Sequence, residues 1–185
     1  MIILLLSGYS GSGKDTFADI FIELCETLGV SYKKYAFAEE VKKDISKMYS
    51  VPLEMLYTQE GKRSIISTSD GNKTLRQLLI EYSADMKKKH GDDYWAQIVC
   101  KQFDNSNKIH IVSDWRYNIE YETVMNYFKD HATIKTIRIY RPDIKILEDC
   151  SEHELDSYKF DIILNNSTTV EALKIHAVEL FKIVN

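Results

Sequence analysis

The sequence predicts a three-layer α/β fold around a parallel central sheet, and three observations support this. Residues 2–7 form an apolar run that ends before a glycine, as expected of a strand buried on both faces. Segments with strand-like and helix-like periodicity then alternate along the chain, which is the order of parallel β-α-β units. At 185 residues, of which 44% are hydrophobic, the chain is long enough to bury a substantial core.

The helices and strands are predicted from hydrophobic spacing and from the residues that end them. Residues 15–28 carry apolar side chains three and four positions apart, and Gly29 supplies a C-terminal stop. Residues 57–73 show little periodicity, so we expect mostly loop there. Further helices are predicted at 39–49, 74–89, 93–103, 120–129 and 170–184, and further strands at 30–37, 109–113, 133–140 and 160–164.

Composition and charge exclude several classes of protein. The net charge of −4 argues against a general nucleic-acid binder, which needs a broad basic surface. The three cysteines are far apart and have no metal-binding spacing, so we expect inert thiols in a reducing compartment. The N-terminal apolar run is too short for a signal peptide or a membrane span. We therefore expect a cytoplasmic protein with neither a membrane nor a nucleic acid as partner.

Residues 8–16 have the pattern of a phosphate-binding loop, Gly-x-x-x-x-Gly-Lys between a predicted strand and a predicted helix. Glycines permit positive φ angles and close backbone approach, so successive N–H groups can converge on a phosphate at the helix N-terminus. The lysine would reach the β- and γ-phosphates. We therefore predict that the loop binds ATP with Mg²⁺. The expected nucleotide contacts are Gly11, Ser12, Gly13 and Lys14.

The residues after the lysine depart from the usual loop pattern. Asp15 stands where Ser or Thr normally holds magnesium, and the hydroxyl comes one place later, at Thr16. Nucleoside monophosphate kinases commonly shift the hydroxyl in this way. We therefore assign Thr16 as a magnesium ligand. Asp15 belongs to the nucleotide-binding segment and also suits the positive end of the helix dipole.

A second acidic residue, Asp114, follows the predicted strand at 109–113. The carboxyl edge of a parallel sheet is where ligands bind, so Asp114 could orient magnesium together with Thr16. An enzyme that phosphorylates an alcohol would instead use such a carboxylate to accept the hydroxyl proton. A helix cap or turn aspartate is the structural alternative.

Only five of the 24 basic residues are arginines, which suggests sites that need a planar, bidentate guanidinium. Arg116 would face the same sheet edge as Asp114, and Arg138 and Arg141 bracket the end of a predicted strand, where they could contact ATP. A phosphate acceptor is already largely anionic at neutral pH, so it needs charge neutralisation and positioning more than a base. For each arginine, a surface salt bridge is the alternative.

Several residues between 57 and 95 are candidates for binding the acceptor. Arg76 opens a predicted helix, and Lys62 and Arg63 lie in the preceding loop, so these three could grip a phosphate. Tyr82 and Trp95 could stack on an acceptor base, although such aromatic residues more often belong to the core.

Several motifs are spread in consistent order over nearly the whole chain. They are Ser7-Gly8 with Gly13-Lys14-Asp15-Thr16, Thr74-Leu75-Arg76-Gln77-Leu78-Leu79, Asp93-Tyr94-Trp95, Val112-Ser113-Asp114-Trp115-Arg116, Ile137-Arg138-Ile139-Tyr140-Arg141-Pro142, Ser151-Glu152 with Leu155, and Asp161-Ile162-Ile163-Leu164-Asn165-Asn166. In these motifs the chain resembles the deoxynucleoside monophosphate kinases of tailed phages and related viruses, within the P-loop nucleotide kinases.

The resemblance implies transfer of the γ-phosphoryl group of ATP to a deoxynucleoside monophosphate, which gives the diphosphate for DNA precursor synthesis. It implies that Arg76 and Arg116 hold the acceptor, that Ser151-Glu152 belong to a closing lid, and that Asn165 and Asn166 lie near the adenine. The resemblance is also compatible with a homodimer, because kinases of this type are often dimers.

The expected organisation is one P-loop kinase domain over residues 1–185, since no linker, repeat or low-complexity tract interrupts the chain. Its core would comprise residues 1–38 and 105–185. A helical insertion at about 39–104 would bind the acceptor, and a polar, charged lid would span about 141–158.

Two other functions remain open at this stage. A kinase of the same architecture could act on another small phosphorylated acceptor, such as phosphomevalonate, whose animal enzymes share the Gly-Lys-Asp sequence and an Asp-x-Arg element. A nucleotide-binding module without turnover is the third option, but acceptor arginines would then have no purpose.

Overall fold

The computed structural model describes residues 1–146, 148, 150–167 and 169–184, except for the side chain of Cys150. The chain divides into two compact units. Unit 1 comprises Met1–Ala36 and Ala96–Asn185, and unit 2 comprises Phe37–Trp95. Among the described residues, no helix is both long enough and apolar enough to span a membrane.

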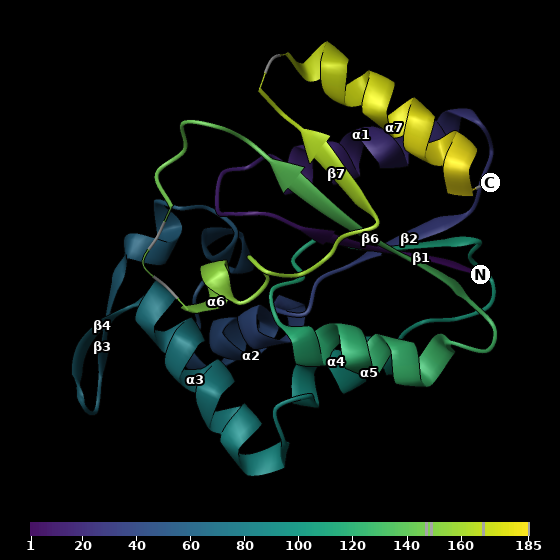
Figure 1. Ribbon diagram of the computed structural model, residues 1–185. Coiled ribbons are helices and arrows are strands. Elements are labelled where there is room, and N and C mark those ends of the chain that lie inside the picture. The colour runs from purple at the N-terminus through teal and green to yellow at the C-terminus, as the bar shows by residue number, and fades with distance from the viewer. Residues whose placement is uncertain (147, 149, 168, 185) are drawn as a thin grey trace. The chain divides into compact units, whose positions relative to one another are not determined.

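Unit 1 is built on a five-stranded parallel sheet with the strand order β2-β5-β1-β6-β7 (Figure 1). β1 lies in the centre, where Ile2 pairs with Ile109 on one side and with Thr133 on the other. This parallel sheet with flanking helices confirms the predicted fold class. The strands are β1 (Ile2–Ser7), β2 (Tyr32–Tyr35), β5 (Ile109–Val112), β6 (Thr133–Tyr140) and β7 (Ile162–Asn165).

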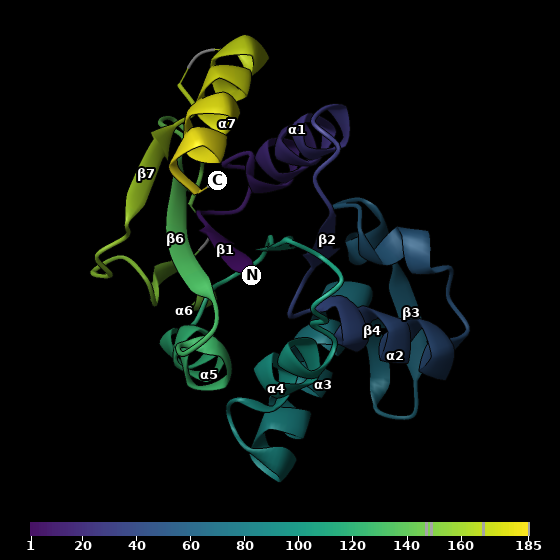
Figure 2. The same ribbon diagram turned by 90° about the vertical axis from the view of Figure 1, so that its right-hand side faces the viewer.

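Helices cover both faces of this sheet. α1 (Lys14–Thr27) and α7 (Val170–Val184) lie on one face and α5 (Asn118–Phe128) on the other (Figure 2). Phe17 and Phe21 of α1 pack with Leu173 and Leu180 of α7 against the apolar side chains of the strands. Removing these apolar surfaces from water is the main stabilising term of the unit.

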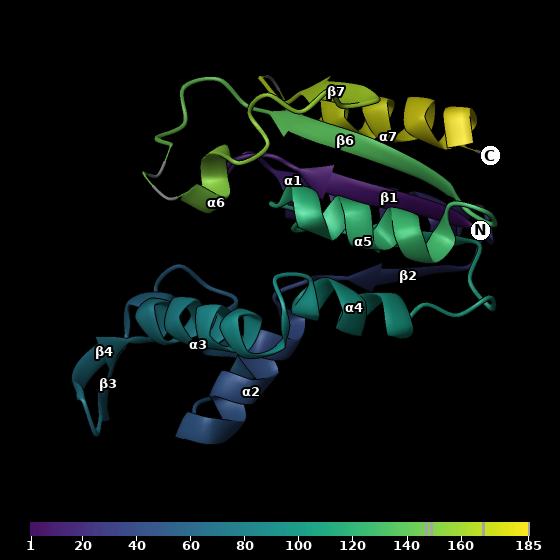
Figure 3. The same ribbon diagram turned by 60° about the horizontal axis from the view of Figure 1, so that its bottom comes forward.

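One end of the sheet carries the segments that the site uses. All five strands run in the same direction, so their carboxyl ends meet at one edge. The short helix α6 (Cys150–His153) lies beyond the carboxyl ends of β1 and β6 (Figure 3).

Unit 2 has its own small core. Ile45, Leu56, Leu75 and Leu78 are buried together, and Leu79 and Tyr82 pack against them. The elements of the unit are α2 (Glu39–Tyr49), the 3₁₀ turns η1 (Leu53–Leu56) and η2 (Gly61–Arg63), β3 (Ile65–Thr68), β4 (Gly71–Thr74) and α3 (Leu75–His90). α4 (Tyr94–Lys101) begins at its end.

The prediction of a loop at 57–73 is wrong for the second half of this range, where β3 and β4 form an antiparallel hairpin. Ile65 pairs with Thr74 and Thr68 pairs with Gly71, so Ser69 and Asp70 form the turn. Most side chains of this hairpin are polar and none is fully buried. Hydrophobic periodicity, which depends on a buried apolar face, therefore gave no strand signal.

Elsewhere the predicted elements are present with shifted ends. The predicted bounds of α2, β6 and α7 match the structure, whereas β2 is four residues long instead of eight. The helix predicted from residue 74 begins at Leu75, because Thr74 is its N-cap. The Thr74 hydroxyl accepts a hydrogen bond from the Gln77 N–H at 3.2 Å, and the Gln77 side chain accepts one from the Thr74 N–H at 2.8 Å.

We predict that Thr74→Ala lowers the free energy of unfolding by about 1 kcal/mol, because it removes the side-chain acceptor of this capping box. Urea unfolding followed by circular dichroism measures the change. Thr74→Ser keeps the hydroxyl, so its free energy of unfolding should fall much less. Equal losses in the two variants would contradict a capping role for this hydroxyl.

Candidate functional site: a phosphate loop

The loop between β1 and α1 turns through three glycines with positive φ angles, +147° at Gly8, +80° at Gly11 and +97° at Gly13. At two of these positions an added Cβ would also come too close to a neighbouring atom, which would have to move. A Cβ on Gly8 would lie 2.4 Å from the carbonyl oxygen of Ile139, and one on Gly13 would lie 2.4 Å from Nδ2 of Asn166. The backbone path of the loop therefore depends on glycine at both ends.

Lys14, the first residue of α1, is folded onto this loop. Its side chain is buried, and Nζ donates hydrogen bonds to the carbonyl oxygens of Gly8 at 2.6 Å and Tyr9 at 2.9 Å. Burial and, after it, the nearby Arg116 guanidinium lower the pKa of Lys14 to about 8, against the opposing effect of nearby carboxylates. The ammonium group is therefore charged at neutral pH and close to titrating.

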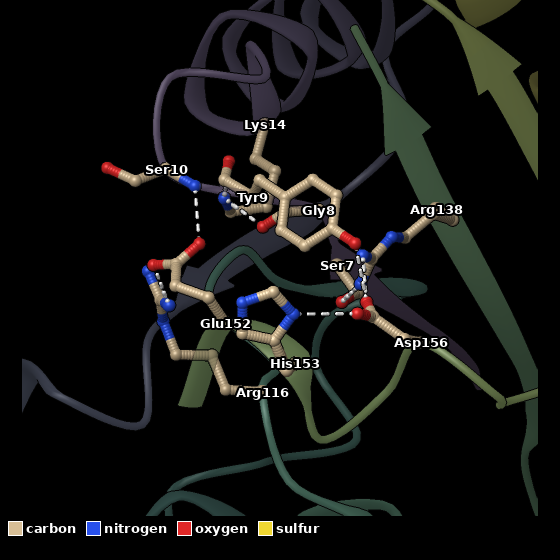
Figure 4. A network of polar contacts seen from close by, with 10 residues as sticks. All are labelled: Ser7, Gly8, Tyr9, Ser10, Lys14, Arg116, Arg138, Glu152, His153 and Asp156. Carbon is tan, nitrogen blue, oxygen red and sulfur yellow. Dashed lines mark hydrogen bonds and ion pairs between the residues drawn. The ribbon is translucent and has the colours of Figure 1, made fainter. Parts of the chain in front are cut away.

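A carboxylate contacts the same loop from α6. Oε2 of Glu152 accepts a hydrogen bond from the Ser10 N–H at 2.7 Å, and Oε1 forms an ion pair with Nη1 of Arg116 (Figure 4). Only 6% of Glu152 is exposed. Buried carboxylates need such partners, and here one partner is a loop amide and the other a guanidinium.

A second group of contacts joins the first loop residues to the segment after α6. The Tyr9 hydroxyl donates to Asp156 at 2.7 Å, and Nη2 of Arg138 donates to the same carboxylate at 3.0 Å (Figure 4). Nδ1 of His153 lies 2.8 Å from the other oxygen of Asp156. Arg138 also donates to the Ser7 hydroxyl at 3.2 Å and lies over the Tyr9 ring, 4.5 Å from its centroid.

These contacts also set the charge of Asp156. Its burial opposes ionisation, but the hydrogen bonds from Tyr9 and His153 and the charge of Arg138 outweigh it and lower the pKa of Asp156. The carboxylate is therefore ionised at neutral pH and can accept hydrogen bonds from both the loop and β6.

Asp114 and Arg116 follow β5 on either side of the fully buried Trp115. The Trp115 N–H donates to the Leu6 carbonyl oxygen at 3.1 Å, which ties this segment to β1. Glu120 accepts hydrogen bonds from the Arg116 N–H at 2.9 Å and from the next N–H at 3.0 Å. The charges of Asp114 and Arg116 both act on Lys14, so the structure places the three groups in one electrostatic environment.

The residues predicted near the adenine differ in position. Asn166 donates from Nδ2 to the Ser12 carbonyl oxygen at 2.9 Å, so it supports the glycine loop directly. Asn165 at the end of β7 and Arg141 just after β6 are exposed. Arg138 has only 11% of its side chain exposed and is occupied by the contacts to Ser7 and Asp156.

The predicted magnesium ligands are single oxygen donors rather than a cluster. Thr16 and Asp15 are exposed in the first turn of α1, and Asp114 is half-buried after β5. Within the described residues, no group of three or more histidine, cysteine, aspartate or glutamate side chains could hold a metal ion. A hydroxyl and a carboxylate nevertheless suit magnesium, which takes oxygen ligands and usually completes its shell with phosphates and water.

The residues predicted to bind the acceptor lie in unit 2. Arg76, the second residue of α3, donates to Oε1 of Gln59 at 2.6 Å, which fixes its guanidinium in unit 2. Lys62 and Arg63 lie in η2, and Arg63 is exposed.

The two predicted stacking residues have different environments. The Tyr82 hydroxyl donates to Asp44 at 2.9 Å, and burial together with this hydrogen bond raises the pKa of Tyr82 to about 12. Trp95 is 3% exposed and donates from Nε1 to the Ser83 carbonyl oxygen at 3.3 Å. Burial of Trp95 favours the core alternative, whereas Tyr82 is half-buried and keeps part of its surface open.

Sequence reasoning did not single out Tyr9, Asp156 or Glu120 as site residues. Tyr9 occupies a variable position of the loop pattern, and Asp156 lies in a segment that is polar throughout. Glu120 follows Tyr117 at the spacing of a capping box, but a tyrosine is not one of the usual first residues of that pattern.

Comparison with solved structures shows which fold this is. The structure of a mutant of the Mycobacterium tuberculosis APS kinase CysC matches with a TM-score of 0.51 and 8% identity, over 98% of this chain and 96% of that one. The same enzyme in complex with AMPPNP and APS gives 0.50 and 10% identity, over 98% and 97%. The fold is that of the P-loop kinases. At this low identity the likeness establishes the fold alone. No protein-family model matches the sequence, and no curated protein is similar to it.

The arrangement can bind a polyphosphate, with loop N–H groups as donors and Lys14 as the cation. We predict that affinity for inorganic tripolyphosphate falls as pH rises above about 8, by roughly tenfold per pH unit. Above this pH, Lys14 of the free protein is mostly uncharged, and anion binding must be accompanied by uptake of a proton at Lys14. Below about pH 8 the lysine is already charged, so this dependence is absent. Calorimetric titration between about pH 7 and 9.5 measures it.

Lys14→Arg is the matched control, because a guanidinium stays charged throughout this range. Its affinity can be lower overall, but the slope above about pH 8 should disappear. The same slope in both proteins would show that another group titrates.

Proposed function

We propose that this protein is an ATP-dependent kinase that transfers the γ-phosphoryl group to a deoxynucleoside monophosphate and gives the diphosphate. One observation carries the proposal. A glycine loop after the central strand of a P-loop kinase fold leads into a helix whose first residue is a buried lysine. This arrangement suits the phosphates of a nucleoside triphosphate.

We infer the roles of residues in unit 1 from the contacts around the loop and from the sequence motifs. Loop N–H groups and Lys14 would bind the β- and γ-phosphates, and Asn166 would hold the loop in place through the Ser12 carbonyl. The Thr16 hydroxyl and Asp114 would hold Mg²⁺, which supplies charge neutralisation between the phosphates when bound. Arg116 would stabilise the transferred phosphoryl group.

The acceptor assignment rests on unit 2 and on the sequence resemblance. Arg76 is held by Gln59, and Lys62 and Arg63 lie in η2, which precedes the β3–β4 hairpin and α3 in the chain. A guanidinium fixed in this way can hold a phosphate monoester in a bidentate manner, which a flexible ammonium group cannot. The half-buried ring of Tyr82 could contact the base.

We expect ATP consumption with one or more deoxynucleoside monophosphates and much less with phosphomevalonate. A coupled assay over all deoxynucleoside and ribonucleoside monophosphates, phosphomevalonate and a no-acceptor control measures this. If only phosphomevalonate were phosphorylated, the proposed acceptor would be wrong and phosphomevalonate would take its place. ATP binding without transfer to any acceptor would point to a nucleotide-binding module.

We predict that Arg76→Lys raises the KM for the accepted monophosphate at least about tenfold and changes the KM for ATP less than about twofold, because it removes bidentate phosphate binding. Steady-state kinetics with each substrate varied in turn separates the two effects. Gln59→Ala, which leaves the arginine but removes its hydrogen bond, should give a smaller change in the same direction. Equal effects on both substrates would contradict the assignment.

A further inference from the structure

Glu152 has the partners that a bound phosphate would have. Its side chain is 4% exposed. One carboxylate oxygen accepts a hydrogen bond from the Ser10 N–H of the glycine loop, and the other forms an ion pair with the guanidinium of Arg116 (Figure 4). Backbone N–H groups of such loops and arginine side chains are the usual donors to phosphate oxygens. A carboxylate presents two anionic oxygens to the same donors.

The rest of the segment anchors this carboxylate. Three residues separate Glu152 from Asp156. Asp156 accepts hydrogen bonds from the Tyr9 hydroxyl and the Arg138 guanidinium. Two carboxylates of one short segment therefore hold two successive loop residues, Tyr9 and Ser10. The main-chain donor at Ser10 is then engaged by the protein itself.

Lys14 also contacts the glycine loop itself. Its ammonium group donates to two loop carbonyl oxygens, at 2.6 and 2.9 Å, instead of extending away from the loop. A polyphosphate that enters must therefore replace the Glu152 carboxylate at the Ser10 N–H and attract the lysine away from the carbonyls.

We infer that Glu152 is an internal anion that binds the glycine loop at Ser10 and competes with the triphosphate for it. Binding of the triphosphate displaces the carboxylate from Ser10 and ends its ion pair with Arg116, so the guanidinium becomes available to a second phosphate. The inference rests on the proposed function, since it describes regulation of the same site. The apparent affinity for nucleotide is the intrinsic affinity multiplied by the fraction of molecules in which Glu152 has left the loop. The smaller this fraction, the weaker the observed binding.

The test compares Glu152→Gln with the wild type by calorimetric titration of ADP and of inorganic tripolyphosphate. Glutamine keeps the size of the side chain and removes the charge that pairs with Arg116. We expect roughly tenfold tighter binding of both ligands, since the competing state becomes less populated. Glu152→Asp keeps the charge but is too short to reach both partners, and it should bind with intermediate affinity. This second variant also tests the inference if the glutamine variant does not fold.

Glu154→Gln is the matched control. Glu154 is exposed, lies two residues away, and its replacement changes the net charge of the protein by the same amount. We expect its affinities to stay within about twofold of the wild type, since surface charges act weakly. Unchanged or weaker binding by Glu152→Gln, or equal tightening by Glu154→Gln, would overturn the inference. If the wild type and Glu152→Gln bind nucleotide equally, only the inference fails. If neither binds, the proposed function fails with it.

Discussion

The site depends on the backbone turn between β1 and α1, which brings the Ser10 N–H to a carboxylate and the Lys14 ammonium group to two loop carbonyl oxygens. Such a turn needs positive φ angles, and at Gly8 and Gly13 it also needs space that a Cβ would fill. An N–H group at such a turn needs an acceptor, and a negatively charged one suits the start of a helix. The contact from Ser10 to Glu152 satisfies this need within the chain itself.

Charge balance around the loop follows from the same constraint. Lys14 and Arg116 carry positive charge close together, and Arg116 contributes to the lowered pKa of Lys14. Glu152 pairs with Arg116 and favours the charged lysine, so a buried anion offsets two cations that would otherwise repel each other. Under the proposed function, a nucleoside triphosphate would bring more negative charge to the same groups.

Some predictions from the sequence followed from local rules and others failed for physical reasons. The hydrophobic spacing in α1, α2 and α7 predicted the ends of these helices to within about one residue, since one face of each helix is buried. The hairpin of β3 and β4 was missed because most of its side chains are polar, no face of it is fully buried, and it is held by pairing between strands. Trp95 was a stacking candidate in the sequence, but packing buries it, and no spacing rule separates these two roles.

The sequence by itself determined the strand, the glycine turn, the lysine and the following helix, because all of these depend on residues within a few positions of one another. Only the tertiary structure decided which charges meet. Arg116 and Glu152 are 36 positions apart, and Tyr9 and Asp156 are 147 apart. Their contacts depend on the strand order of the sheet, which brings the carboxyl ends of β1, β5 and β6 to one edge. Hydrophobic periodicity and motif spacing carry no information on pairing over such separations.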